Sequence, residues 1–194
     1  MERTLENLTK AFVGESQARN RYTFYAKIAQ KEGFEQIAGI FLETAEQEKT
    51  HAKRLFEHIQ EVKELMNRDN SEIVVECSSP NSYGTTTENL RDAANGEKYE
   101  HSEMYPNFAV IAEEEGLDKI AKRFKSIAQA EKHHEERYLK LLKEVEAGSV
   151  HKKGTETVWI CRECGYMHVG NEAPEVCPSC DHPRAYYQVQ NENY

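Results

Sequence analysis

The sequence predicts a mainly α-helical fold, a four-helix bundle with a long crossover, followed by a small domain built on four cysteines. Apolar residues recur at the spacing of an amphipathic helix through residues 4–66 and 88–147. Of the 34 acidic residues, 30 are glutamate and 4 are aspartate, and glutamate is the better helix former. Four of the five cysteines fall between residues 161 and 180, where the helical pattern has ended.

Each helical stretch divides into two helices. Glu32-Gly33 interrupts the first, and glycine is suited to end a helix because it readily adopts a left-handed conformation. Gly116 interrupts the second in the same way. The segment Asn67–Thr87 between the stretches is rich in turn-forming residues, with one strand-like run at 73–75. About twenty extended residues span roughly 66 Å, and a helix of about 30 residues is roughly 45 Å long. This segment can therefore cross the whole bundle.

We expect a bundle domain at residues 1–147, a linker at 148–156 and a small domain at 157–194. The formal net charge of −9 argues against a nucleic-acid partner, since such binding needs a basic face. No stretch approaches the roughly 20 apolar residues of a membrane span. The N-terminal residues lack the apolar core of a secretory signal. These features predict a cytoplasmic protein with neither a membrane nor a nucleic-acid partner.

The helical part contains an internal repeat. With an offset of 82, residues 6–15 match residues 88–97 at six of ten positions. With an offset of 83, residues 22–62 match residues 105–145 at sixteen of forty-one positions. The pattern therefore indicates a duplicated helical hairpin.

The repeat offset grows by one residue between Glu97 and Tyr105. One extra residue inside a helix is usually absorbed as a π-bulge, often at a functional site. We therefore expect a π-helical turn around Glu100.

Carboxylates and histidines occupy matching positions of the two repeats. Two helices each carry a Glu-x-x-His motif, whose two side chains share one helix face, and the other two helices each carry one glutamate. The residues are Glu48, His51, Glu131, His134, Glu15 and Glu97. This is the di-iron carboxylate pattern of ferritin-like bundles. Any one of these glutamates alone would indicate only a solvated charge, but the shared register argues against that for the set.

One more glutamate, three histidines and a cysteine lie outside this repeated pattern. Glu100 follows Glu97 by one helical turn and is a seventh candidate ligand, without a counterpart in the first repeat. Three further histidines, His58, His101 and His133, are expected on the surface. Cys77, alone in the crossover, is expected to be an ordinary free thiol.

The remaining four cysteines have the spacing of a tetrahedral thiolate site. Cys161-x-x-Cys164 and Cys177-x-x-Cys180 are separated by twelve residues. Such a site suits Zn²⁺ or a single iron, and a zinc ribbon is the simpler structural alternative. A small core of nearby aromatic residues, with a redox site in the bundle, favours iron. The aromatic residues are Trp159, Tyr166, Tyr186 and Tyr187.

Taken together, these motifs resemble the rubrerythrin family, in which a ferritin-like di-iron domain precedes a rubredoxin-like domain. The resemblance covers nearly the whole chain. It is carried by GESQARNRY (14–22), EKTH (48–51), NGEKYE (95–100), EKHH (131–134) and WICRECGY with APEVCPSCDHP (159–183).

The resemblance implies a role for each candidate residue. It implies that two non-haem irons are bound by seven side chains, with Glu48 and Glu131 as bridges. The implied ligands are Glu15, Glu48, His51, Glu97, Glu100, Glu131 and His134. Tyr22 and Tyr105 look like the family's tyrosines that hydrogen-bond to ligand carboxylates. His51 and Glu100 are implied to exchange at one iron, and one further iron to sit on Cys161, Cys164, Cys177 and Cys180.

By the same resemblance, the expected activity is reduction of hydrogen peroxide to water, which protects the cytoplasm against oxidative stress. Electrons would come from an NAD(P)H-linked rubredoxin reductase, or from rubredoxin, through the iron on the four cysteines. That iron would lie beside the di-iron site of a partner subunit. The expected assembly is therefore a homodimer, head-to-tail or domain-swapped.

Two other functions remain open from the residues alone. A ferritin-type iron store would use the same ligands, although an appended cysteine domain fits poorly in a closed cage. An electron carrier or redox sensor would use the four-cysteine site for signalling and the bundle for partner contact. Gel filtration distinguishes a ferritin-type cage from a dimer. An assay of NAD(P)H-dependent peroxide loss distinguishes an electron carrier or redox sensor from an enzyme.

Overall fold

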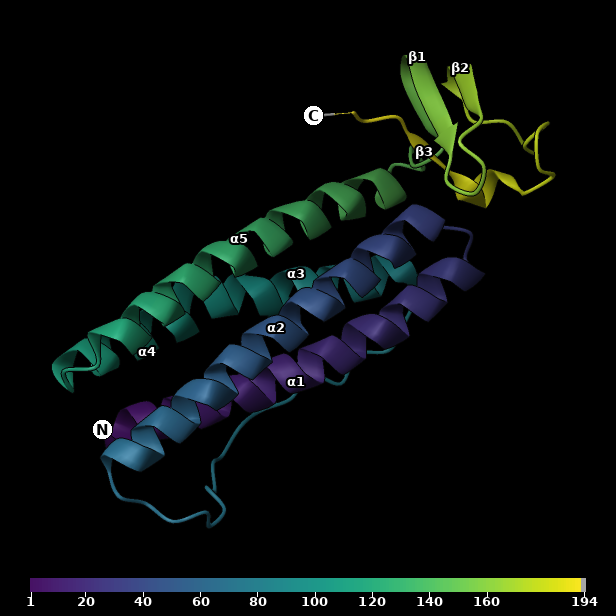
Figure 1. Ribbon diagram of the computed structural model, residues 1–194. Coiled ribbons are helices and arrows are strands. Elements are labelled where there is room, and N and C mark those ends of the chain that lie inside the picture. The colour runs from purple at the N-terminus through teal and green to yellow at the C-terminus, as the bar shows by residue number, and fades with distance from the viewer. Residues whose placement is uncertain (193–194) are drawn as a thin grey trace.

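Four long helical segments form the predicted bundle in the computed structural model, which describes residues 1–192 (Figure 1). Two form a first hairpin and two a second, with a π-helical turn inside the third segment. The elements are α1 (Glu2–Lys31), α2 (Glu35–Leu65), α3 (Thr86–Tyr99), η1 (Glu100–Met104), α4 (Tyr105–Glu114) and α5 (Asp118–Glu146). The mainly helical bundle with a crossover is therefore confirmed.

The crossover between the hairpins runs back along the length of the bundle (Figure 1). It lies between the end of α2 at Leu65 and the start of α3 at Thr86. The strand-like run at 73–75 forms no strand in the described part of the chain. Ile73 instead packs against an apolar cluster of the bundle, which holds this part of the crossover in place.

Both hairpin turns depend on a glycine with positive φ. Gly33 has a φ of 84° and Gly116 a φ of 75°. In each turn the next residue donates its backbone N–H back across the glycine, Phe34 to Ala29 and Leu117 to Ala112, both at 2.8 Å. Other residues adopt this left-handed conformation at a cost, so the predicted helix ends are confirmed with their physical reason.

The two hairpins cap each other's first helical turns. Glu32, at the end of α1, accepts a hydrogen bond from the backbone N–H of Thr86 at 3.0 Å. Glu115, at the end of α4, accepts from the backbone N–H of Thr4 at 2.9 Å and from its hydroxyl at 2.6 Å. These pairs occupy equivalent positions of the repeat. A glutamate of each hairpin therefore accepts from a backbone N–H group at the start of the other hairpin's first helix, where the helix itself provides no acceptor.

Two apolar clusters fill the bundle, one toward each end. One contains Leu5, Leu55 and Phe124, among others, and the second contains Phe41 and Tyr138. These five side chains are fully buried, and burial of one such side chain contributes roughly 1.5–3 kcal/mol. The candidate metal ligands lie between the clusters, so apolar packing on both sides fixes the helices that carry them.

The small domain is a three-stranded antiparallel sheet in the order β2-β1-β3. Its elements are β1 (Lys152–Cys161), β2 (Met167–Glu172), η2 (Arg184–Tyr186) and β3 (Tyr187–Val189). Trp159 and Tyr187 are fully buried in its core and Tyr186 packs against them. Tyr166 is 36% exposed and stays outside this core, contrary to the prediction. Strand β1 begins inside the segment expected as a linker.

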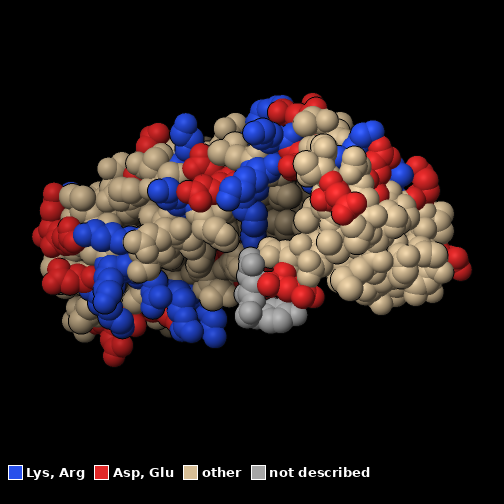
Figure 2. Space-filling model, turned by 90° about the horizontal axis from the view of Figure 1, so that it is seen from above, with Lys and Arg blue, Asp and Glu red and all other residues tan. Residues whose placement is uncertain are grey.

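The small domain contacts the end of the bundle where α1 turns into α2 (Figure 1). His151 stacks on Phe34 with ring centroids 6.3 Å apart, and the guanidinium of Arg162 lies directly over Gly39. The domain is at the right of Figure 2, where its surface is mostly uncharged, with acidic and a few basic groups along one side. Within the described residues, none of the helices has a run long and apolar enough to cross a membrane.

Glu115→Gln should destabilise the bundle by about 1–2 kcal/mol at pH 7, the usual cost of losing a helix cap. Burial raises the pKa of Glu115, but hydrogen bonds led by Thr4 outweigh it and lower the pKa to about 2. The carboxylate therefore stabilises the fold above its unfolded pKa of roughly 4.3, and this stabilisation is lost as the pH falls toward 2. Denaturant unfolding of both proteins across this range measures the difference. The control Glu114→Gln, in an exposed ion pair, should change stability little.

Candidate metal centres

A layer of buried carboxylates and imidazoles crosses the middle of the bundle. Each of the four long helical segments contributes to it: Glu15 from α1, Glu48 and His51 from α2, Glu97 from α3, and Glu131 and His134 from α5. The four glutamates are at most 1% exposed and His134 is 2% exposed. The i,i+3 spacing of each Glu-His pair puts both side chains on the inward helix face.

The layer divides into two overlapping groups of possible metal ligands. One contains Glu15, Glu48, His51 and Glu131, and the other contains Glu48, Glu97, Glu131 and His134. The ligand atoms within each group lie within 4.8 Å of one another. Glu48 and Glu131 belong to both groups, which is the arrangement that two bridged metal ions require.

Both histidines face the shared carboxylates through Nδ1. His51 Nδ1 is 3.0 Å from Oε2 of Glu48 and 2.9 Å from Oε1 of Glu131. His134 Nδ1 is 2.8 Å from Oε2 of Glu131 and 3.1 Å from Oε1 of Glu48. Each imidazole therefore meets one oxygen of each shared carboxylate, as the duplicated hairpin predicts.

Six ligand atoms in this layer are buried and form no hydrogen bond of favourable geometry with the described residues, although each lies within 3.9 Å of a neighbouring imidazole nitrogen or carboxylate oxygen. They are Glu15 Oε2, Glu48 Oε1, Glu97 Oε2, Glu131 Oε1, Glu131 Oε2 and His134 Nδ1. Buried polar atoms without partners are costly, and oxygen and imidazole nitrogen are suitable ligands for iron. The donor set therefore fits two metal ions.

The buried carboxylates repel one another. Burial raises the pKa of Glu15 well above its usual value, and Glu131 and Glu48 raise it further. Burial followed by Glu48 raises the pKa of Glu97 to about 8. Burial would also raise the pKa of Glu48, but the two adjacent imidazoles outweigh it and lower that pKa to about 2. Bound cations would relieve this repulsion.

Two tyrosines form hydrogen bonds with Glu97 and Glu15, the glutamates that each belong to only one of the two ligand groups. Tyr22 on α1 donates its hydroxyl hydrogen to Oε1 of Glu97, and Tyr105 on α4 donates to Oε1 of Glu15. Burial raises the pKa of both phenols well above 10, and the bonded glutamates raise it further, so both hydroxyls keep their protons. Each bond runs from a tyrosine of one hairpin to a glutamate of the other.

Glu100 begins the predicted π-helical turn, which the structure confirms as η1. Glu100 is not a member of either ligand group. Burial raises the pKa of Glu100 well above its usual value, and the charges of Glu97, Glu131 and Glu48 raise it further. It lines a cavity of about 320 Å³ together with Arg21 and Cys77. The extra residue of the second repeat therefore places one more carboxylate between the buried ligands and an open cavity.

The remaining histidines differ partly from the prediction. His133 is exposed, as predicted. His58 is only 4% exposed, on the same helix as the buried Leu55 and Ile59, and its Nδ1 is 3.0 Å from Glu61. His101 is half-buried and pairs with Glu135 at 2.6 Å. The surface prediction is therefore wrong for His58 and only partly right for His101.

Sequence reasoning missed Gln47 and Arg21. Gln47 Oε1 lies 2.9 Å from Nε2 of His134. Arg21 is 9% exposed, pairs with Asp92 at 2.5 Å and lies over the ring of Tyr22. No repeat signal marks either residue, because the matching positions of the other hairpin carry different residue types. The one available signal was that both directly precede a predicted site residue.

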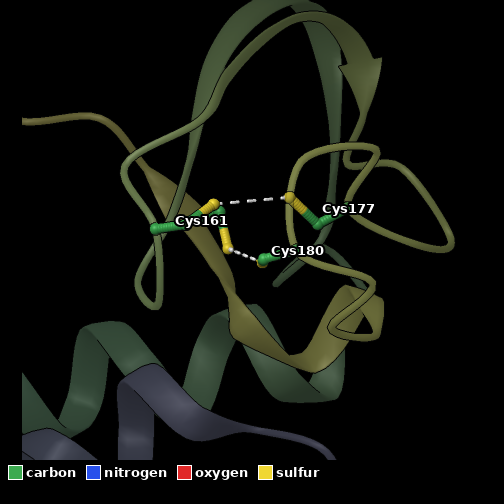
Figure 3. Close-up of side chains that lie close together, drawn as sticks. Cys161, Cys177 and Cys180 are labelled. Carbon is green, nitrogen blue, oxygen red and sulfur yellow. Dashed lines mark hydrogen bonds between the residues drawn. The ribbon is translucent and has the colours of Figure 1, made fainter.

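The sulfurs of Cys161, Cys177 and Cys180 face one another in the small domain (Figure 3), and Cys164 completes the group of four. Sγ of Cys161 is 3.8 Å from that of Cys180, and Sγ of Cys164 is 3.7 Å from that of Cys177. A tetrahedral ion with metal–sulfur bonds of about 2.3 Å places its sulfurs about 3.8 Å apart. The site therefore fits one tetrahedral ion, while Cys77 lies outside it as a free, exposed thiol.

Two equivalent turns carry these cysteines. After each Cys-x-x-Cys, the next residue has a positive φ, 76° at Gly165 and 59° at Asp181. Each donates its backbone N–H to the carbonyl of the first cysteine, Cys161 or Cys177, at 2.9 Å. The turns thereby direct two sulfurs from each Cys-x-x-Cys toward one point.

Comparison with known proteins covers both domains. Residues 6–142 match the Rubrerythrin family, and residues 159–188 match the family described as Rubrerythrin, rubredoxin-like domain. The chain is 57% identical over 195 residues to a putative rubrerythrin of Methanocaldococcus jannaschii, covering 100% of this chain and 96% of the relative. It is 49% identical over 193 residues to a rubrerythrin of Porphyromonas gingivalis, covering 99% and 92%.

A solved structure is also similar to this chain over nearly its whole length. The fully reduced, all-ferrous state of nigerythrin is similar with a TM-score of 0.64 and 36% sequence identity. The match covers 96% of this chain and 86% of that chain.

The purified protein, with its four-cysteine iron oxidised, should be red and contain three iron atoms per chain. Cys177→Ser should lose the red colour and bind two, because removal of one thiolate opens the tetrahedral site. Metal analysis with a visible spectrum measures both, and Cys77→Ser is the control. A colourless wild-type protein with zinc on the thiolates would contradict the iron assignment.

Proposed function

Because the chain belongs to the rubrerythrin family, we propose that it is a non-haem di-iron peroxidase that reduces hydrogen peroxide to water and protects the cytoplasm against oxidative stress. The bundle contains a di-iron carboxylate–histidine site and the small domain a rubredoxin-type metal site of four cysteines. Conversion of one peroxide to two waters takes two electrons and two protons. Two ferrous ions held side by side supply both electrons together and avoid the one-electron step to hydroxyl radical.

The overlap of the two ligand groups beside an additional carboxylate carries this proposal. Glu48 and Glu131 would be the bridging ligands, since both belong to the two groups. Glu15 and Glu97 would each bind at one metal position. Each bridge has its two oxygens directed at different histidines, so the protein keeps both positions close together before peroxide binds.

Tyr22 and Tyr105 keep the outer carboxylates in place. Each phenol donates to one oxygen of its glutamate and leaves the other oxygen, Oε2 of Glu97 or Glu15, without a partner among the described residues. The free oxygen is then directed at the metal position. Since both phenols keep their protons, this orientation is maintained over the physiological pH range.

We propose that His51 and Glu100 alternate at one metal position. A neutral imidazole suits ferrous iron, whereas an anionic oxygen suits the harder ferric ion. Three observations support the exchange. Glu100 is outside both ligand groups yet close enough to raise the pKa of Glu15, it lines the cavity that offers peroxide a route inward, and the His51 side chain is 16% exposed against 3% for His134.

The small domain, residues 157–194, is the proposed electron carrier for the bundle, residues 1–147. The four-cysteine site takes electrons one at a time from an NAD(P)H-linked rubredoxin reductase, or from rubredoxin, and passes two of them to the bundle for each peroxide. Cys164 is exposed and Cys180 half-buried, so the sulfur atoms lie near the surface where a donor can approach.

The distance between the two metal sites within one chain favours electron transfer between subunits. The small domain touches α2 at Gly39 through Arg162, the residue after Cys161. His51 is twelve residues further along the same helix, about 18 Å at 1.5 Å per residue. Electron tunnelling weakens steeply over such distances. A homodimer, head-to-tail or domain-swapped, would bring the four-cysteine site of one subunit close to the bundle site of the other.

A groove beside the bundle site offers a docking place for that partner domain. It has a volume of about 520 Å³ and lies between α1 and α2, where Ala52, the residue after His51, lines it. Its floor includes Phe12 and Phe56, and its rim carries Arg19, Lys49 and Lys53, of which the first two also contact Glu46. Residues 154–194 carry 6 acidic and 2 basic side chains, a net charge of −4 that complements this rim.

Glu100→Ala should slow peroxide turnover roughly 10²-fold, the scale of losing one charged group at the reacting atoms. The red iron of the small domain should be unaffected. The control is Glu103→Ala, which removes an exposed carboxylate from the same π-helical turn. Peroxide consumption at fixed reductase and NAD(P)H measures the effect, and wild-type turnover in Glu100→Ala would exclude the exchange with His51.

Cys161→Ser should abolish NAD(P)H-driven turnover but leave the bundle competent. After chemical reduction, each bundle of the variant should still consume one peroxide, because the two bundle irons hold both electrons that the reaction needs. A single-turnover assay measures this, with Cys77→Ser as the control. Wild-type steady-state turnover in Cys161→Ser would contradict the relay.

A further inference from the structure

The two bundle histidines differ in what their outer ring nitrogen meets. Nε2 of His134 lies 2.9 Å from Oε1 of Gln47, across from α5 to α2. Nε2 of His51 makes no hydrogen bond to the described residues. Both rings otherwise face the shared carboxylates through Nδ1 at similar distances. The duplicated site is therefore unequal at one atom of each imidazole.

The orientation of the Gln47 amide follows from its other partner. Its Nε2 donates to Oε1 of Glu43 at 3.3 Å, so its carbonyl oxygen must face His134 and accept the Nε2 hydrogen. With that hydrogen on Nε2, the lone pair of His134 is on Nδ1, which faces the ligand group. Gln47 thereby selects the tautomer that can bind a metal.

Gln47 is itself held by a chain of contacts between α2 and α5. Arg137 donates to Oε1 of Glu43 at 2.8 Å and to the hydroxyl of buried Thr44 at 2.6 Å. Arginine lowers the pKa of Glu43, so this carboxylate stays charged and keeps its hold on the amide. The outer support of His134 is therefore tied to the packing of two helices.

The other hairpin lacks this support. At the repeat offset of 83, Gln47 corresponds to Ala130, and Glu43 to Ser126. Arg137 corresponds to Arg54, which pairs with Glu57 of its own helix at 2.7 Å and reaches no partner on α5 among the described residues. Since Ala130 has no polar side chain, position 130 offers His51 nothing to accept its outer hydrogen.

We propose that Gln47 is the positioning residue that keeps His134 on its metal, and that alanine at position 130 is what leaves His51 free to be exchanged. The assignment of Gln47 needs only the di-iron site. The consequence for His51 rests on the proposed exchange with Glu100. Loss of the hydrogen-bond partner of a metal-bound histidine typically costs about 10–100-fold in metal affinity. The two metal positions should therefore release iron at different rates, with the His51 side faster.

Gln47→Met tests the first part, since methionine has a similar length without the amide. The full-length, ferrous-loaded protein is mixed anaerobically with a ferrous chelator, and the iron retained by the small domain is measured afterwards by the red absorbance that returns when the sample is reoxidised. Wild type should release the bundle iron in a fast and a slow phase. Gln47→Met should accelerate the slow phase about 10–100-fold and leave the fast phase unchanged.

Gln129→Met is the matched control, because Gln129 is exposed on α5 and makes no side-chain hydrogen bond among the described residues. It should release iron as wild type does. A general loosening of the bundle would accelerate both phases in Gln47→Met, and that result, or an unchanged slow phase, would overturn the assignment of Gln47.

Ala130→Gln tests the second part by giving His51 the missing acceptor. The fast phase should become slower and approach the slow phase, while iron on the His134 side is unaffected. An unchanged fast phase would overturn the explanation of why His51 is free. Iron release is measured without peroxide, so its outcome is independent of whether Glu100→Ala impairs turnover.

Discussion

The burial of mutually repelling carboxylates at the centre of the bundle is the constraint on which the rest of the structure depends. Four glutamates lie there at no more than 1% exposure between two apolar clusters. Burial of uncompensated charges costs far more than a typical packing contact contributes. Cations bound within this layer would relieve the repulsion, and the oxygens without hydrogen-bond partners are the atoms that would coordinate them.

Duplication explains how one chain builds such a layer. Two copies of a hairpin, packed face to face, place equivalent residues opposite each other. The same symmetry produces the reciprocal tyrosine bonds to Glu97 and Glu15 and the reciprocal helix caps at Thr4 and Thr86. Chemistry that must treat two metal positions differently needs departures from this symmetry. They are found at Glu100, in the π-helical turn, and around the outer nitrogens of the two histidines.

The two domains provide chemically distinct metal environments. Carboxylates and imidazoles in the bundle suit a pair of metal ions with room for a small oxygen ligand, whereas four thiolates in the small domain enclose a single ion. The thiolate site is built on tight turns near the surface, and the bundle site is shielded by packed helices.

Sequence periodicity, glycine positions and spacing by themselves determined the helices, their ends at Gly33 and Gly116, and the residues of both candidate metal groups. The slip in the repeat offset located the π-helical turn, because one extra residue in a helix has few other outcomes. Only the tertiary structure decided which surfaces meet. The burial of His58, the exposure of Tyr166 and the contact of Gln47 with His134 depend on neighbours distant in sequence. A periodic pattern specifies a buried face, but the groups opposite that face are set by how the helices pack.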